Sequence, residues 1–236
     1  MLARIALALT ALAGCQLDDR FVYRWDDRPV LCSQGIDDLT NGVDVHELEE
    51  QLRAAAATRT VALLHAHGPG TTVSVELLTR VLDRARELDL AHLTYSELTS
   101  GPPRAGLALG FDDADVRGWT AIAALLDAYG ARVTFFVSRY TYWTDEEHDL
   151  LRGLAERGHD VQPHGVDHVE ATRFAREHGA DAYVATQVEP ASAVLDAAGY
   201  RPTTFAYPFG YSNPALDAAI LAQLDRVRVG PGGCPD

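Results

Sequence analysis

The chain has little positive charge, few cysteines and no long hydrophobic run. Its 236 residues include 20 Lys and Arg against 34 Asp and Glu, which gives a formal net charge of −14. No Lys/Arg-rich stretch is present, which argues against nucleic acid as a partner. An acidic surface repels anionic polymers and so favours neutral or cationic substrates. A hydrophobic content of 47% is typical of a globular protein and argues against disorder.

The first residues have the pattern of an export signal. A short start containing Arg4 precedes apolar residues 5–12, a run too brief to span a bilayer. Leu12-Ala-Gly-Cys15 resembles the bacterial lipobox, which would make Cys15 the lipidated first residue; an ordinary secretory signal with a chance cysteine is the alternative. We therefore expect a signal peptide over residues 1–14, a lipidated tether or arm over residues 15–31, and a bacterial periplasmic or cell-surface lipoprotein attached to the membrane by its lipid.

Two cysteines remain if Cys15 carries lipid. Cys32 and Cys234 lie near opposite ends of the mature chain, and such a pair can form a disulfide in an oxidising compartment, although sequence separation alone does not show that they meet.

Removing fourteen residues from 236 leaves 222, enough for one domain with a full core. No internal repeat or linker interrupts the part between the two cysteines. We expect one catalytic domain over residues 32–236, acting as a monomer.

Apolar β-like runs alternate with helical patterns along most of the chain. Strands are predicted at residues 60–64, 106–111, 132–137, 203–207 and 225–229, with a short one from Val161, and helices at residues 46–57, 73–88, 117–129, 145–157, 181–198 and 214–223. This alternation predicts parallel strands with helices outside, arranged as a barrel or an open sheet. In barrels the loops after the strands converge on one face, where active sites form.

Two acidic residues and two histidines stand directly after predicted strands. Asp112 and Asp113 end one strand, and His164-Gly-Val-Asp-His168 follows the extended residues 160–163. The i, i+4 spacing predicts both imidazoles on one face of a helical turn. One carboxylate and two imidazoles are a ligand set that zinc accepts with positions left open, so the pattern predicts metal-assisted hydrolysis with Asp112 as a base. Taken singly, helix capping and chance spacing explain each pair equally well.

A third strand end carries Phe205-Ala-Tyr-Pro-Phe-Gly210. Proline and glycine on either side of an aromatic residue predict a rigid loop that presents backbone N–H groups or an aromatic wall. Taken alone, a plain strand-to-helix turn is the simpler interpretation.

Together these motifs resemble the polysaccharide deacetylase family, carbohydrate esterase family four. Gly110-Phe-Asp-Asp113, Thr134-Phe-Phe-Val137, His164-x-x-x-His168 and Tyr207-Pro-Phe-Gly210 match the family in order and spacing from about residue 105 to 212. The resemblance implies an α/β fold, a distorted (β/α) barrel of about seven parallel strands. It also implies a metal-dependent hydrolase that removes acetyl groups, N-acetyl before O-acetyl, from an extracytoplasmic polysaccharide or oligosaccharide.

The resemblance also assigns roles to the residues. Asp112 becomes the general base, and Asp113, His164 and His168 become ligands of a divalent metal ion, zinc first, with cobalt, nickel or iron as alternatives.

The third motif supplies the loop formed by Tyr207, Pro208 and Phe209. In the family this loop contacts the oxyanion and the substrate, and here the backbone N–H would be that of Phe209. Two positions depart from the family. Gly165 stands where Ser or Thr is common, and Ala206 replaces an arginine that normally orients the base. We expect another group to take over that orientation, or activity to be reduced.

The family's closing motif, a strand ending in Leu-x-His with the proton-donating histidine, is missing after residue 212. A similar passage lies upstream at Leu63-Leu-His65, and residues 36–39 resemble the segment that supplies an aspartate to tune that histidine. The resemblance therefore implies a circularly permuted chain with His65 as the acid. His67 is an alternative to His65, and either Asp37 or Asp38 is the partner carboxylate.

The permuted order places the break after residues 225–229. Cys32 and Cys234 then lie on its two sides, and a disulfide between them would rejoin the fold and close a long loop, worth roughly 4–5 kcal/mol in the chain-entropy model. Two other functions fit the same ligand set, because it dictates metal chemistry and not the acyl group. One is a non-catalytic glycan- or metal-binding lipoprotein, and the other is an esterase or amidase acting on a small acylated molecule.

Overall fold

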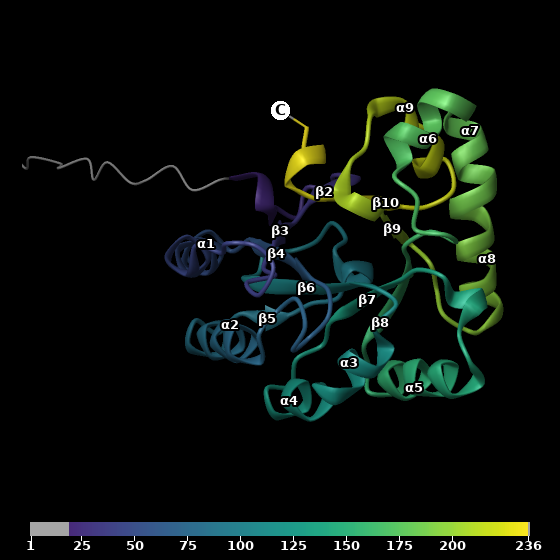
Figure 1. Cartoon of the computed structure of the whole chain (residues 1–236). Coiled ribbons are helices and arrows are strands. Elements are labelled where there is room, and N and C mark those ends of the chain that lie inside the picture. The colour runs from purple at the N-terminus through teal and green to yellow at the C-terminus, as the bar shows by residue number, and fades with distance from the viewer. Residues whose placement is uncertain (1–18, 236) are drawn as a thin grey trace, which may run out of the picture.

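A computed structural model describes residues 19–235 of the chain. The predicted signal peptide over residues 1–14 and the predicted lipidation site Cys15 lie outside the described residues. Within residues 19–235, strands and helices alternate, with the strands inside and the helices around them (Figure 1). No helix in this part of the chain is long and apolar enough to cross a membrane.

The strands form two sheets in which nearly all neighbours are parallel. The larger sheet has seven strands in the order β1–β4–β6–β7–β8, with β3 paired to β4 and β5 paired to β6. The smaller sheet has the order β2–β10–β9. Only β1 runs antiparallel to its neighbour within these two sheets. The strands are β1 (Val22–Tyr23), β2 (Val30–Cys32), β3 (Gln34–Gly35), β4 (Val61–Ala66), β5 (Ala91–His92), β6 (Gly106–Asp113), β7 (Thr134–Val137), β8 (Asp160–Pro163), β9 (Thr204–Ala206) and β10 (Arg226–Val229).

Two junctions connect the sheets into a distorted barrel. β2 and β3 are successive parts of one extended segment, and between them the N–H of Ser33 donates to the Val229 carbonyl at 3.0 Å. At the other junction, the Gln162 side chain of β8 accepts hydrogen bonds from the backbone N–H groups of Thr203 and Thr204, at 2.8 and 2.9 Å. The parallel strands therefore follow the order β10, β2/β3, β4, β6, β7, β8, β9, which agrees with the predicted mixed α/β barrel.

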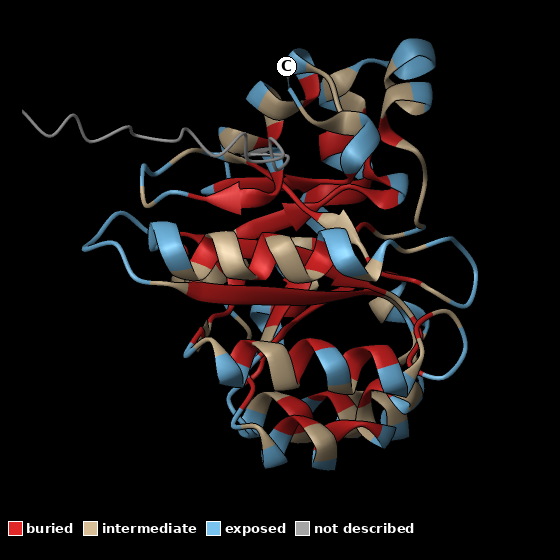
Figure 2. Cartoon of the chain, turned by 90° about the vertical axis from the view of Figure 1, so that its left-hand side faces the viewer, coloured by how far each residue is buried: buried red, intermediate tan, exposed pale blue. Residues whose placement is uncertain are grey.

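The helices cover the outside of the strands with one buried face each (Figure 2). In α2, where a helix was predicted at residues 73–88, the buried face is an apolar stripe formed by Leu77, Leu78, Val81, Leu82 and Ala85. The predicted helix at residues 117–129 is divided at Ile122 into two short helices. The α-helices are α1 (Val45–Thr58), α2 (Val75–Glu87), α3 (Val116–Ala121), α4 (Ala123–Ala128), α5 (Asp145–Glu156), α6 (Ala171–His178), α7 (Ala180–Tyr183), α8 (Glu189–Ala197) and α9 (Pro214–Leu221).

Both ends of the described chain contribute to the barrel. Val22 and Tyr23 pair with β4 and are buried, so this part of the predicted N-terminal arm is packed against the domain. β2 and β10 pair in parallel with Val229 opposite Cys32. The structure contains the expected disulfide between Cys32 and Cys234, whose Cα atoms are 5.6 Å apart. Parallel pairing of β2 with β10 is compatible with circular permutation, which stays a prediction.

Removing the disulfide should destabilise the fold. Replacing Cys32 and Cys234 together with alanine should lower the free energy of unfolding by roughly 2–5 kcal/mol, because the bridge closes a loop across a sequence separation of 202. Urea unfolding followed by tryptophan fluorescence measures the change. Reduced wild-type protein is the matched control and should unfold like the double variant. Equal midpoints for the double variant and the oxidised wild type would contradict a stabilising bridge.

Candidate active site

The predicted ligands meet because three neighbouring parallel strands end at the same edge. Asp113, the last residue of β6, lies opposite Val137 of β7. Val137 in turn lies opposite Pro163, the last residue of β8, and His164 follows directly. Because parallel strands present their C-terminal ends on one side, this register brings Asp113 and His164 to the same place.

Asp113, His164 and His168 form a cluster that can hold a metal ion. Their ligand atoms all lie within 4.8 Å of one another. Asp113 Oδ1 is 2.9 Å from His168 Nε2 and 3.5 Å from His164 Nε2. His164 Nδ1 lies 2.8 Å from the Ala206 carbonyl oxygen, so it must carry the proton and leaves the Nε2 lone pair for a cation. Burial opposes ionisation of Asp113, but contacts with both imidazoles hold the pKa of its carboxyl well below the usual range. The donor set fits a zinc-type divalent ion.

The two histidines do not lie on a helical turn, and that prediction was wrong. β8 ends at Pro163 and α6 begins at Ala171, and residues 164–170 between them form a loop. Left-handed backbone at Gly165 (φ +85°) and His168 (φ +57°) turns this loop back, so that the two imidazole centroids lie 5.0 Å apart. A residue with a side chain would be strained at Gly165, which gives a local reason for this departure from the family pattern.

Asp112, the predicted base, is buried and held by an arginine that the sequence interpretation missed. Its Oδ2 is 2.5 Å from Nη2 of Arg228 in β10. Burial opposes ionisation, but the guanidinium of Arg228 and the neighbouring imidazoles lower the pKa of Asp112 to about 2. The other oxygen, Oδ1, accepts no hydrogen bond from residues 19–235. Asp112 is therefore an ionised carboxylate with one oxygen fixed and one available.

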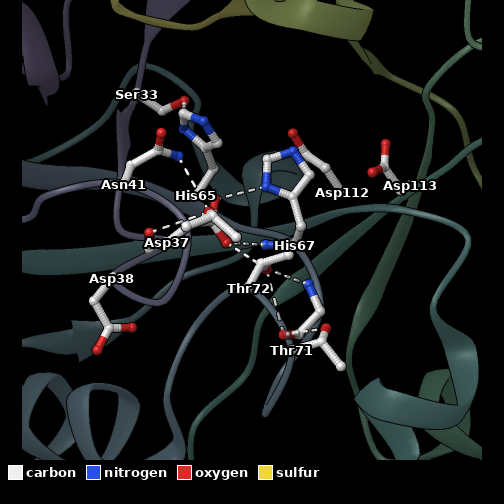
Figure 3. Close-up of polar contacts among 12 residues, drawn as sticks. Ser33, Asp37, Asp38, Asn41, His65, His67, Thr71, Thr72, Asp112 and Asp113 are labelled. Atoms are coloured by element: carbon white, nitrogen blue, oxygen red, sulfur yellow. Dashed lines mark hydrogen bonds and ion pairs between the residues drawn. The ribbon is translucent and has the colours of Figure 1, made fainter.

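A second histidine–carboxylate pair lies beside these aspartates (Figure 3). His67 Nδ1 is 2.6 Å from Asp37 Oδ2, and the backbone N–H of His67 donates to Asp37 Oδ1 at 3.0 Å. The Thr72 hydroxyl donates to the same Oδ1 at 2.7 Å. Burial lowers the pKa of His67, but the contact with Asp37 and the nearby aspartates raise it to about 9. His67 is thus protonated at neutral pH.

The expected pairing of His65 with Asp37 is corrected by this geometry. β3 and β4 are parallel with Gly35 opposite His65, so Asp37, two residues further along, reaches His67 and not His65. His65 Nδ1 instead lies 2.8 Å from the Ser33 hydroxyl, and burial lowers the His65 pKa to about 3. Of the two candidate aspartates, Asp37 is the one that contacts a histidine. Asp38 instead accepts hydrogen bonds from the backbone N–H and the hydroxyl of Ser74 at the start of α2.

The three residues of the predicted substrate loop have different surroundings. Tyr207 is buried, and its hydroxyl donates to Asp217 Oδ1 at 2.8 Å, while the next residue, Pro208, is also buried. Phe209 is 61% exposed with a left-handed backbone (φ +64°), and its ring centroid is 4.8 Å from that of His168. Of these three residues, Phe209 alone therefore presents an accessible aromatic surface, and it lies next to His168.

Comparisons with known proteins agree with these motifs. A family model described as polysaccharide deacetylase matches residues 100–226. The fold is similar to that of IcaB from Ammonifex degensii, with a TM-score of 0.59 and 19% identity over 75% of this chain and 87% of that one. Weaker similarity connects it to the Streptococcus pyogenes deacetylase PplD (TM-score 0.46, 18% identity, 82% and 79% covered) and to the Bacillus subtilis peptidoglycan deacetylase PdaC (0.41, 25%, 52% and 56%). No curated protein matches the chain.

The family match covers the strand end with both aspartates, the loop with both histidines and the segment with Phe209. It extends over more than half of the sequence, and the IcaB similarity independently supports the fold. The chain belongs to the polysaccharide deacetylase family.

Proposed function

We propose that the protein is a metal-dependent hydrolase that removes acetyl groups, N-acetyl first, from an extracytoplasmic polysaccharide. The observation that carries this proposal is the division of work between two adjacent carboxylates. Asp113 is shared by two imidazoles, whereas Asp112 is fixed through one oxygen by Arg228 and keeps the other free. Asp113 is thus suited to binding a cation, and Asp112 is suited to accepting a proton.

The cluster of Asp113, His164 and His168 would hold the ion, which when bound polarises an acyl carbonyl and acidifies a coordinated water. Asp112 stays ionised at neutral pH because Arg228 keeps its pKa low, so it can accept a proton from the attacking water through Oδ1. Neither this pairing nor the ligand cluster specifies which acyl group is used; the family and the likeness to carbohydrate deacetylases favour acetyl on sugar.

The proton donor to the leaving amine is better assigned to His67 than to His65. A general acid must be protonated before the carbon–nitrogen bond breaks. Asp37 keeps His67 protonated, with a pKa of about 9, whereas buried His65, with a pKa of about 3, is neutral at physiological pH. We therefore assign the acid role to His67, with Asp37 as the residue that keeps it charged.

The loop around Phe209 would complete the site. The backbone N–H of Phe209 is the proposed oxyanion donor. The buried residues Tyr207 and Pro208 anchor the loop to the domain. This support is visible in the contact between Tyr207 and Asp217 and in the hydrogen bond from Gly230 N–H to the Gly210 carbonyl at 3.0 Å. The exposed Phe209 ring gives an apolar surface for the acetyl methyl or a sugar face.

We also propose that the protein works outside the cytoplasm as a lipoprotein, with residues 1–14 as its signal peptide and Cys15 as its lipid anchor. The disulfide between Cys32 and Cys234 supports an oxidising compartment. The catalytic unit proposed for residues 32–236 is extended by the packed strand β1.

Acetate release from acetylated glycans tests the proposed function. The protein is stripped with a chelator, reloaded with zinc, and incubated with N-acetylated chito-oligosaccharides and with O-acetylated xylan. We expect acetate only from the zinc-loaded protein, and more from the N-acetylated substrate. Bound zinc without acetate from any glycan would contradict the proposal and favour a non-catalytic binding protein. Acetate from small acylated molecules alone would favour an esterase or amidase.

Loss of a ligand should remove the metal. His168→Ala should weaken zinc binding by more than the roughly 10–100-fold typical of losing an outer partner of a ligand, because a direct donor is lost. Isothermal titration with zinc measures the affinity. His178→Ala is the matched control, since His178 is exposed and lies near Glu177 instead of Asp113. Equal affinity in the two variants would remove His168 from the ligand set.

The two candidate acids can be separated by substitution. His67→Gln should lower kcat by roughly 10²–10⁴-fold, the usual contribution of a general acid, while His65→Gln should have a clearly smaller effect. Acetate release under saturating substrate gives kcat, and zinc content is measured in parallel. Retained turnover in His67→Gln together with loss in His65→Gln would return the acid role to His65.

The pH profile should depend on Asp37. A protonated donor is lost as the pH rises through its pKa, so the alkaline limb of kcat should lie no higher than about 9. Asp37→Asn removes the charge that raises the His67 pKa, and the limb should move to lower pH. Rates measured across a pH series give the limb position, with Asp38→Asn as the control. An unmoved limb in Asp37→Asn would contradict the role of this pair.

A further inference from the structure

The family's base-orienting arginine is replaced by Ala206, and the structure contains a guanidinium one strand away. β9 and β10 are parallel, and Arg228 of β10 lies directly opposite Ala206 of β9. Residues opposite one another on paired strands point to the same side of a sheet. We propose that Arg228 is the positioning residue that orients Asp112 in the deacetylation, in place of the arginine missing at position 206. The inference rests on the proposed function.

The contact between the two side chains is direct and excludes solvent. Arg228 Nη2 is 2.5 Å from Asp112 Oδ2, and the two side chains are 1% and 3% exposed. The guanidinium carbon of Arg228 lies 4.9 Å from the centroid of the Phe136 ring, so the aromatic ring packs against the guanidinium group. A buried charge pair of this kind fixes the direction of both groups, because neither can turn to water.

The contact also fixes which oxygen of Asp112 is available. Oδ2 is taken by Arg228, while Oδ1 has no hydrogen-bond partner among the described residues. Rotation of the carboxylate would break the contact with Arg228 or exchange these two oxygens. Arg228 therefore determines where the base points, without itself contacting the substrate.

The strand that carries Arg228 is held from both sides. β10 lies between β2 and β9, and the Arg228 carbonyl accepts from Tyr207 N–H at 3.0 Å. The next residue, Val229, lies opposite Cys32, whose disulfide to Cys234 ties the chain just after β10. The arginine is thus presented from a rigid element, as positioning requires.

The same strand provides a matched control. Arg226 lies two residues before Arg228, is likewise buried, and forms an ion pair with Asp27 at 2.7 Å. Its partner Asp27 is 60% exposed, and Asp112 is paired with Arg228 instead, so loss of Arg226 removes a buried arginine of β10 and leaves the Asp112–Arg228 contact in place.

The experiment compares four zinc-loaded variants for kcat, KM and zinc content. They are Arg228→Ala, Arg228→Lys, Arg226→Ala and the double variant Ala206→Arg/Arg228→Ala, which returns the guanidinium to the family's usual strand. Low, non-denaturing guanidinium chloride is added to each as a possible replacement for the missing group. We expect Arg228→Ala to lose about 10–100-fold in kcat with little change in KM or zinc content, and Arg226→Ala to lose much less.

Rescue distinguishes positioning from a purely structural role. Added guanidinium should raise kcat of Arg228→Ala but not of Arg226→Ala, and the double variant should recover much of the lost rate. Equal losses in Arg228→Ala and Arg226→Ala, or folded Arg228 variants that no guanidinium restores, would overturn the inference. If Arg228→Ala does not fold, a folded but inactive double variant would overturn it and a folded, active one would support it. Absence of acetate release by the wild type would instead overturn the proposed function, and this role with it.

Discussion

A buried ion pair between Asp112 and Arg228 connects the two sheets of the barrel. Asp112 is the next-to-last residue of β6 in the larger sheet and Arg228 lies in β10 of the smaller one, and both side chains are almost fully removed from water. Separating a buried charge from its partner is costly, so the distance between the two sheets is constrained at this point. The same constraint leaves one oxygen of Asp112 for chemistry. The packing of the two sheets and the orientation of Asp112 are therefore linked through this contact.

Parallel register determines which groups meet at the C-terminal edge. β6, β7 and β8 end at matching positions, which places Asp113 beside His164. On the other side of β6, the register of β3 against β4 carries Asp37 past His65 to His67. Local backbone completes the site, because left-handed residues turn the loop after β8 back toward Asp113. The candidate site thus combines a cluster that could hold a metal ion, the proposed base in a fixed orientation and a charged histidine, each from a different pair of strands.

The sequence predicted the parts of this molecule that depend on local pattern. Long strands and amphipathic helices such as α2 and α5 were found because their apolar periodicity is strong. The short strands β1, β2, β3 and β5 were missed, since two or three residues are too few to show an alternation of apolar and polar side chains. The ligand set followed from its spacing, yet the helical turn assumed for His164 and His168 was wrong because φ at Gly165 and His168 is set by the loop.

Contacts between distant segments were harder to predict. The partner of Asp37 depends on the register between β3 and β4, which the spacing of residues along the sequence does not show. His65 was therefore favoured over His67. Arg228 was missed for the same reason, although Arg226-Val-Arg-Val229 in a predicted strand is an unusual pattern that indicates arginines with carboxylate partners. The disulfide was expected only through the proposed permutation, and the structure contains it.

The most direct test of the proposed mechanism is to measure zinc content and acetate release together in Asp112→Asn. This change keeps the size of the side chain and removes its charge, while Asp113 and the two histidines are untouched. The variant should bind zinc like the wild type and lose roughly 10²–10⁴-fold in kcat, the usual contribution of a general base. Normal acetate release by zinc-loaded Asp112→Asn would contradict the assignment of Asp112 as the base.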